Sequence, residues 1–386
     1  MDQRTIQLCF ALLRSVICSV DLNDTEKALF SEEQLPHLMA VSKKHDISHL
    51  VALGLKQNSL ISKDDVEIDK SIFKAVYRYE QLNYEYKRLC SVLESAGIDF
   101  IPLKGSVLRK YYPEPWMRTS CDIDILVHSD ALDRATAHLV KTLKYVKKER
   151  TSHDISLFSP GGRHIELHFD LVEEGKANRA DDILNSVWKN VSLRENYNHW
   201  YEMTDEFFYF YHIAHMAKHF GGGGCGIRPF IDLWILDRIG GVNQSKRDVL
   251  LTQGNLLQFA NAARKLSRVW FDQEKADKLS LKMQKYILYG GVYGSADNRL
   301  AVQQNKRGGR IGYILYRIFV PYVQLKRFYP ILERHRWLTP FFRIRHWFRL
   351  LNPDTAKRAK REVVINRNVQ SSKVEEMKIF LEEIGL

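Results

Sequence analysis

The sequence predicts an α+β protein in which a short region of strands and helices is flanked by helical segments. Between residues 98 and 171, apolar runs with a period of two alternate with short helical patterns. Before and after that region, apolar residues recur at helical spacing. With 386 residues, of which 45% are hydrophobic, the chain can bury one or two sizeable cores.

Residues 1–97 are predicted to form an N-terminal helical segment. Apolar residues near its start recur at helical spacing: Ile6, Phe10, Leu13 and Ile17. A longer helical pattern covers residues 77–96 and ends at Gly97, a residue type that often terminates helices. Arg14 interrupts the apolar run near the N-terminus, which favours a helix of a folded domain over a signal peptide.

Residues 98–175 are predicted to form a core that contains the strands. The first strand ends at Lys104, and the short helix after it stops before Pro113. The predicted elements are strand 98–103, helix 106–112, strand 121–127, helix 130–142 and strands 144–149, 154–159 and 163–171. The Gly161-Gly162 pair supplies a hairpin turn between the last two strands.

Two carboxylates share one face of the predicted strand 121–127. Ile123, Ile125 and Val127 point to one side of this strand, and Asp122 and Asp124 point to the other. Neighbouring carboxylates repel each other unless a cation lies between them. Their Cα atoms should lie about 6.6 Å apart, which suits two Mg²⁺ ions roughly 3.5–4 Å apart.

A D-x-D pattern alone also occurs on solvated strand faces, so its context matters. Here it follows a strand, a glycine turn and a short helix. Gly105 allows the backbone to approach a phosphate closely, and Ser106 is expected to cap the helix whose N-terminus would face that phosphate. Together these features predict a phosphate-handling metal site.

The same residues resemble the DNA-polymerase-β-like nucleotidyltransferases, and within them a family of uncharacterised bacterial nucleotidyltransferases. That family has the patterns L-K-G, Y-x-x-P-x-x-R and D-[IL]-D-[IL]-L-V. They match Leu103-Lys104-Gly105, Tyr112 with Pro115 and Arg118, and Asp122 to Val127. The resemblance implies a small mixed sheet with helices on one face. It also implies transfer of a nucleoside monophosphate from an NTP to a hydroxyl or phosphate acceptor, with release of pyrophosphate.

The resemblance further implies a third carboxylate on a later strand. The family pattern E-L-H falls on Glu166 to His168, and Glu166 shares its strand face with His164, His168 and Asp170. We predict Glu166 as the third carboxylate because Asp170 lies at the strand end, about 13 Å farther along.

Residues 176–300 are predicted to form a helical second domain. His215 and His219 share a helix face, but Met216 stands where a zinc protease has its glutamate, so a zinc site is not expected. The family pattern H-x-x-K-H with G-[IL]-R-x-x-x-D falls on this region. It implies that Lys218, His219 and Arg228 contact the triphosphate; the alternative is a helix pair held by surface ion pairs.

Residues 301–386 form a basic, aromatic-rich C-terminal region. Residues 305–370 contain 16 Lys and Arg against 3 Asp and Glu, while the whole chain has a net charge of +12. Residues 306–350 are interpreted in three ways: a surface that binds anionic lipid, a face that binds nucleic acid, or a tail whose aromatics pack on the body. We favour the membrane over nucleic acid, because genes of the resembled family often lie among polysaccharide-assembly genes.

The predicted site therefore has two sets of residues. The catalytic and metal-binding set is Asp122, Asp124 and Glu166, with two Mg²⁺ ions and Mn²⁺ as an alternative. The nucleotide-binding set is Lys104, Gly105, Ser106, Arg118, Lys218, His219 and Arg228. Lys104 and Arg118 have structural ion pairs as an alternative role.

The expected substrate is an NTP, with ATP weakly favoured, in polysaccharide or natural-product assembly. A second hypothesis is a catalytically silent nucleotide-binding or membrane-associated scaffold. Five scattered cysteines without a C-x-x-C pattern indicate a reduced, cytoplasmic protein, with the inner membrane face as a second location.

Overall fold

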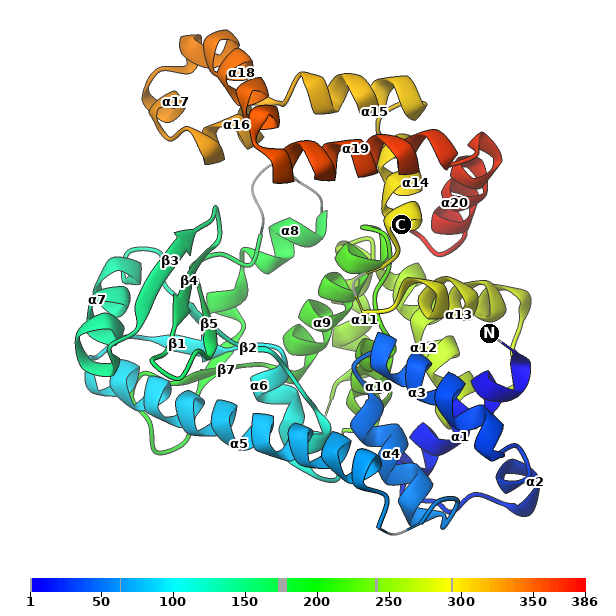
Figure 1. The fold of residues 1–386 in the computed structure, drawn as a ribbon. Coiled ribbons are helices and arrows are strands. Elements are labelled where there is room, and N and C mark those ends of the chain that lie inside the picture. Colours follow the sequence, from blue (N-terminus) through cyan, green and yellow to red (C-terminus); the bar gives the residue numbers. More distant parts are fainter. Residues whose placement is uncertain (1, 63, 173–178, 240–241, 293) are drawn as a thin grey trace.

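The computed structural model describes residues 2–62, 64–172, 179–239, 242–292 and 294–386. A mixed sheet lies beside a large helical body, and a helical arm lies along one edge of the molecule (Figure 1). The α+β class is thus confirmed. The predicted boundary at residue 175 falls outside the described residues, and the predicted domain limits stay predictions.

The main sheet has five strands in the order β1-β2-β5-β4-β3. Their bounds are β1 Phe100–Pro102, β2 Asp122–Val127, β3 Val146–Arg150, β4 Asp154–Phe158 and β5 His164–His168. Only β2 and β5 run parallel to each other, and the other neighbours are antiparallel. The predicted hairpin turn between β4 and β5 is present, since the amide of Gly162 donates to the Ser159 carbonyl.

Strand β5 ends at His168, three residues earlier than predicted. The Asp170 carboxylate lies beyond the strand and accepts a hydrogen bond from the Val172 amide, 2.8 Å away. The alternation in the sequence continues to residue 171, but backbone pairing with β4 stops at Asp154. Asp170 therefore does not share the strand face of Glu166.

Two helices pack on one face of the sheet, α5 (Val66–Ser95) and α7 (Leu132–Leu143). Leu89 of α5 and Leu139 of α7 are fully buried in one core with Ile123 and Ile125 of β2. Because side chains alternate along a strand, the neighbouring carboxylates of β2 point to the opposite face.

The N-terminal helices and the helical body share a second, larger core. Phe10 of α1 stacks on Trp270 of α12 with ring centroids 4.3 Å apart. The helices of this part are α1 Gln3–Cys18, α2 Asp24–Lys27, α3 Leu35–Lys44, α4 Ser48–Gln57, α8 Arg179–Leu184, α9 Asp205–Phe220, α10 Arg228–Leu236, α11 Gln244–Gln253, α12 Leu257–Phe271 and α13 Lys278–Gly290. A small hairpin, β6 (Val191–Leu193) and β7 (Tyr201–Met203), precedes α9.

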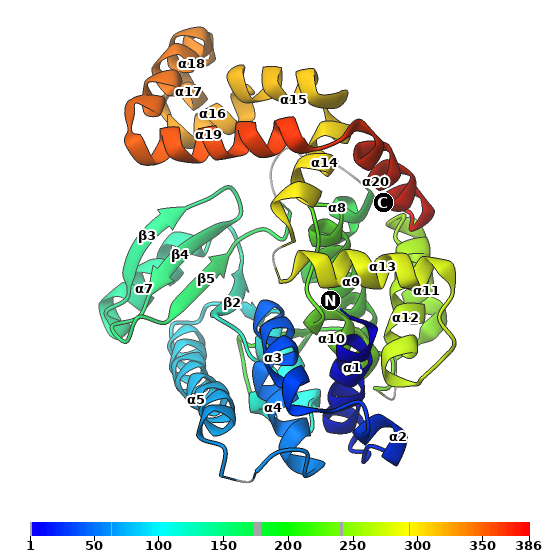
Figure 2. The same cartoon turned by 45° about the vertical axis from the view of Figure 1, so that its right-hand side comes forward.

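The C-terminal region forms an arm that packs on the body through α14 and α20 (Figure 2). Its helices are α14 Ala296–Lys306, α15 Gly309–Ile318, α16 Tyr322–Phe328, α17 Ile331–Arg334, α18 Thr339–Trp347, α19 Pro353–Asn368 and α20 Ser371–Glu383. Arg317 of α15 and Glu362 of α19 form an ion pair at 2.8 Å, and a small separate core lies around Leu325 and Phe342. Among the described residues, no helix combines the length and hydropathy that crossing a bilayer requires.

Candidate active site

The three predicted carboxylates lie next to one another on the two parallel strands. Asp122 pairs in register with His164, and Asp124 pairs with Glu166. All three carboxylates line a cavity of about 1220 Å³ between the sheet and the helical body. The parallel pairing of β2 and β5 therefore brings together residues that are more than 40 positions apart in sequence.

Asp124 is the most buried of these carboxylates, with 3% of its surface exposed. Lys104 Nζ lies 2.7 Å from Asp124 Oδ1, and His168 Nε2 lies 3.0 Å from the same oxygen. Burial alone would raise the pKa of Asp124, but the Lys104 ammonium and the His168 hydrogen bond outweigh it and lower the pKa. Asp124 is thus held as a carboxylate.

Asp122 has the opposite electrostatic environment. Burial and the negative charge of Asp124 raise the pKa of Asp122 to about 6. Two carboxylates with opposite pKa shifts in one cavity are a mark of a functional site.

His168 connects two of the carboxylates and was not among the predicted site residues. Its Nε2 atom lies 3.0 Å from Asp124 Oδ1 and 3.4 Å from Glu166 Oε2. Burial lowers the pKa of His168, but these two hydrogen bonds raise it above its ordinary value overall. The sequence held a signal for it, because His168 follows Glu166 by two positions on the same strand face.

The donor atoms of these residues can hold a divalent cation. Asp122 groups with His164 and Glu166, and Asp124 groups with Glu166 and His168; in each group the donor atoms lie within 4.8 Å of one another. Carboxylate oxygens suit Mg²⁺, and the imidazoles favour Mn²⁺ relative to an all-oxygen site. The donor set therefore fits a bound cation, which would compete with the Lys104 ammonium for Asp124.

A further donor group combines Asp154, the first residue of β4, and His153, the residue before it, with His168 of β5. Within the described parts of the chain, none of the metal-capable groups includes His215 or His219. These two imidazoles instead lie with their Nε2 atoms 3.1 Å apart on α9.

Lys104 reaches Asp124 from a sharp turn after β1. Its backbone has φ +46° and ψ −121°, in the half of conformational space that most residues avoid. Such strain is kept where the surrounding structure fixes it, often at functional sites. The next residue, Gly105, lies close to Ser120, because a Cβ at position 105 would be 3.3 Å from the Ser120 Cβ.

The prediction that Ser106 caps the following helix was wrong. Helix α6 (Gly105–Leu108) begins one residue earlier, with Lys104 at the N-cap position and no side-chain cap. Ser106 lies inside the helix and lines a separate cavity of about 240 Å³ together with Arg109. All of the other predicted site residues line the large cavity.

The basic residues of the helical body lie on the opposite wall of the large cavity. Lys218 and His219 come from the last turn of α9, and Arg228 begins α10. Tyr211 of α9 also lines the cavity and is buried, and sequence reasoning gave no signal for it.

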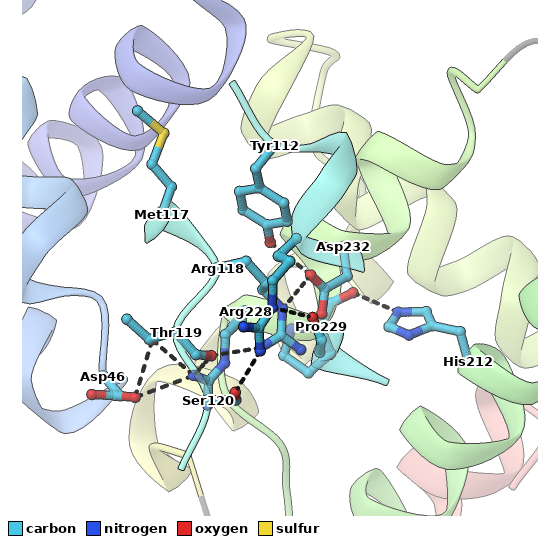
Figure 3. Close-up of polar contacts among 12 residues, drawn as sticks. Asp46, Tyr112, Met117, Arg118, Thr119, Ser120, His212, Arg228, Pro229 and Asp232 are labelled. Carbon is cyan, nitrogen blue, oxygen red and sulfur yellow. Dashed lines mark hydrogen bonds and ion pairs between the residues drawn. The ribbon is translucent and has the colours of Figure 1, made fainter. Parts of the chain in front are cut away.

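Arg118 forms a buried ion pair with a residue 114 positions away (Figure 3). Its Nε donates to Asp232 Oδ1 at 2.7 Å, and the Tyr112 hydroxyl donates to the same oxygen at 2.6 Å. Burial would lower the pKa of Arg118, but Asp232 raises it above its ordinary value. For Arg118 the structural ion pair, which was the alternative role, is therefore present.

Comparison with known families adds the class of chemistry. A family model described as "Uncharacterised nucleotidyltransferase" matches residues 31–272, which include the sheet, the carboxylates and the helices that carry Lys218 and Arg228. Searches among curated proteins and among solved structures find no match. Since the family model covers more than half of the chain, the protein belongs to this family of uncharacterised nucleotidyltransferases.

Proposed function

We propose that the protein is a metal-dependent nucleotidyltransferase that moves a nucleoside monophosphate from an NTP to a hydroxyl or phosphate acceptor. The observation that carries the proposal is the register of β2 and β5. It sets Asp124 beside Glu166, with Asp122 two residues before Asp124, on the face that lines the cavity. This arrangement gives oxygen donors for two cations next to a basic wall that suits a triphosphate.

In this proposal Asp122 and Asp124 would hold two Mg²⁺ ions, with Mn²⁺ as an alternative, and Glu166 would complete the second site. The ions supply charge neutralisation at the phosphates of the NTP. The acceptor oxygen attacks the α-phosphorus, and the bond from that phosphorus to the bridging oxygen of pyrophosphate breaks. Glu166 accepts the acceptor proton, a step that contributes roughly 10²–10⁴-fold in general acid–base catalysis.

The positive residues around the cavity bind the triphosphate in this proposal. With a cation bound at Asp124, Lys104 would instead contact a phosphate oxygen. The backbone of Gly105 faces the same phosphates, and Lys218, His219 and Arg228 contact them from the helical wall. ATP is the nucleotide to test first.

A silent scaffold on the same fold is the second candidate, and one contact favours it. Lys104 lies on Asp124 at 2.7 Å, where it would compete with a metal ion. The two candidates differ in turnover: the enzyme consumes NTP, whereas the scaffold binds it without release of pyrophosphate.

The test is incubation of the purified protein and Mg²⁺ with host lysate and each α-labelled NTP in turn. We expect label to enter one class of acceptor, and we expect Asp124→Asn to abolish this transfer while the fold is kept. Asp69→Asn, which removes a surface carboxylate on α5, is the matched control. Near-normal transfer by Asp124→Asn would contradict the metal assignment.

We also propose that the arm binds an anionic membrane from the cytoplasmic side. Many of its large apolar side chains are exposed, including Trp337 at 76%, Phe341 at 64% and Phe348 at 63%. Arginines lie among them, and Arg349 stacks on the exposed ring of Phe328. Aromatic rings at headgroup depth with cations near anionic lipid give reversible binding, at about 1 kcal/mol for each basic residue.

Vesicle sedimentation tests this proposal. The protein should sediment with phosphatidylglycerol vesicles at low salt and be released at high salt. The triple change Trp337→Ser, Phe341→Ser and Phe348→Ser should abolish sedimentation, whereas Phe73→Ser, at an equally exposed ring on α5, should not. Failure of the protein to sediment with these vesicles at low salt would contradict the membrane proposal.

A further inference from the structure

The loop directly before Asp122 is held by two arginines that meet on one carbonyl group (Figure 3). Arg118 Nη1 donates to the Thr119 carbonyl at 2.7 Å, and Arg228 Nη1 donates to the same oxygen at 2.6 Å. Arg228 Nη1 also lies 3.0 Å from Thr119 Oγ1. The loop therefore has a fixed path into the first residue of β2.

Each arginine also pairs with a different aspartate. Arg118 is paired with Asp232 of α10, and the exposed fractions of the two side chains are 11% and 1%. Arg228 is paired at 3.1 Å with Asp46 Oδ2, in the turn between α3 and α4. The two aspartates come from the helical body and from the N-terminal segment, which are separate in sequence from the sheet.

Neither aspartate lines the large cavity. Asp46 also lies 3.7 Å from Arg78 of α5, and it accepts a hydrogen bond from Thr119 Oγ1 at 3.4 Å. Asp46 and Asp232 can thus influence a bound nucleotide or metal only through the two arginines and the loop that these arginines hold.

We propose that Asp46 and Asp232 are positioning residues for the Asp122 carboxylate. Each holds one arginine against the Thr119 carbonyl, and together they fix the loop from two sides. Shifts of about 1 Å in a catalytic group can cost around 100-fold in rate, so a relaxed loop should be costly. The proposal rests on the proposed function, because it takes Asp122 as a metal ligand.

The test measures two quantities in Asp46→Asn and Asp232→Asn: steady-state kinetics and Mn²⁺ affinity without nucleotide, by electron paramagnetic resonance. We expect kcat to fall and the Mn²⁺ dissociation constant to rise, each about 10–100-fold, which is the usual range for partners of metal ligands. KM for the NTP should stay within about threefold in Asp232→Asn, because neither Asp232 nor its partner Arg118 contacts the NTP in the proposed function.

The matched controls remove carboxylates of the same segments that lie outside this network. Asp237→Asn breaks the ion pair with Arg247 at the end of α10, and Asp69→Asn breaks the pair with Lys56. Both controls should keep kcat and Mn²⁺ affinity, even where the melting temperature falls. Asp46 is 38% exposed in its side chain, so Asp46→Asn tests the proposal even if Asp232→Asn fails to fold.

Two results would overturn the proposal in different ways. If Asp122→Asn loses Mn²⁺ but Asp46→Asn and Asp232→Asn behave like the controls, the positioning role is wrong and the metal site stands. If Asp122→Asn keeps Mn²⁺ affinity, the proposed metal site is wrong, and the positioning role fails with it.

Discussion

Loss of the Asp232 carboxylate should destabilise the protein more than most single substitutions. Asp232 is fully buried, and its Oδ1 atom accepts hydrogen bonds from Arg118 Nε and the Tyr112 hydroxyl. In Asp232→Ala the guanidinium stays buried without its counter-charge, and the hydroxyl loses its acceptor. Both effects destabilise the folded state, because each leaves a desolvated polar group without a partner.

The size of the effect follows from the burial of the pair. Removing one partner of a buried ion pair costs about 3–5 kcal/mol. If all 386 residues unfold as one unit, each residue contributes an unfolding entropy of about 2.1 cal/mol/K. The melting temperature should then fall by about 4–6 °C.

Scanning calorimetry measures this shift, and a second variant isolates its cause. Replacing the whole cluster in Tyr112→Phe, Arg118→Met, Asp232→Leu should recover most of the loss, since an apolar substitute for a buried ion pair is often neutral. A fall below about 1 °C for Asp232→Ala would contradict this stabilising role of the ion pair. So would a triple variant no more stable than the single one.

Two further predictions concern charge in the protein interior. Burial lowers the pKa values of His45 and His49 to about 4. Between pH 6.5 and 4 the unfolded chain therefore binds more protons than the folded one. Stability should fall as the pH drops through that window, by up to about 3 kcal/mol for each histidine. The drop should be smaller in His49→Gln; an equal pH dependence in that variant contradicts the assignment. In Lys104→Met, loss of the ammonium beside Asp124 should tighten Mn²⁺ binding about 10-fold, and NTP turnover should fall. Weaker Mn²⁺ binding would show that Lys104 does not compete with the metal.

The local parts of the fold were predictable because short-range patterns determine them. Alternation of Ile123, Ile125 and Val127 with Asp122 and Asp124 placed the carboxylates on one strand face, and β2 has that arrangement. The two glycines after Ser159 likewise mark a turn that the structure contains. In both cases the information lies within a few neighbouring residues.

Contacts between distant segments were not predictable from these patterns. The sequence shows that Lys104 and Arg118 are positive, but not that they pair with Asp124 and Asp232. Asp46 lies in a turn of the N-terminal segment, where no pattern suggested a role near the cavity. Such pairings depend on strand register and helix packing, and patterns among neighbouring residues do not reveal either.

The start of α6 shows how one residue can change an assignment. The pattern suggested that Ser106 caps the helix, because serine is a common N-cap residue. Lys104, with a positive φ, takes the N-cap position, so the helix starts at Gly105 and Ser106 lines the smaller cavity. The same backbone turn brings the Lys104 ammonium to Asp124.

In the proposed function, the carboxylates on β2 and β5 support nucleotidyl transfer. The most direct measurement follows α-labelled and γ-labelled forms of the same NTP with Mg²⁺, the protein and host lysate, beside Asp124→Asn. Transfer of the α-label to an acceptor, with the γ-label in pyrophosphate and neither event in Asp124→Asn, is the predicted result. Transfer of the γ-label to the acceptor, or equal α-label transfer by Asp124→Asn, would contradict the claim.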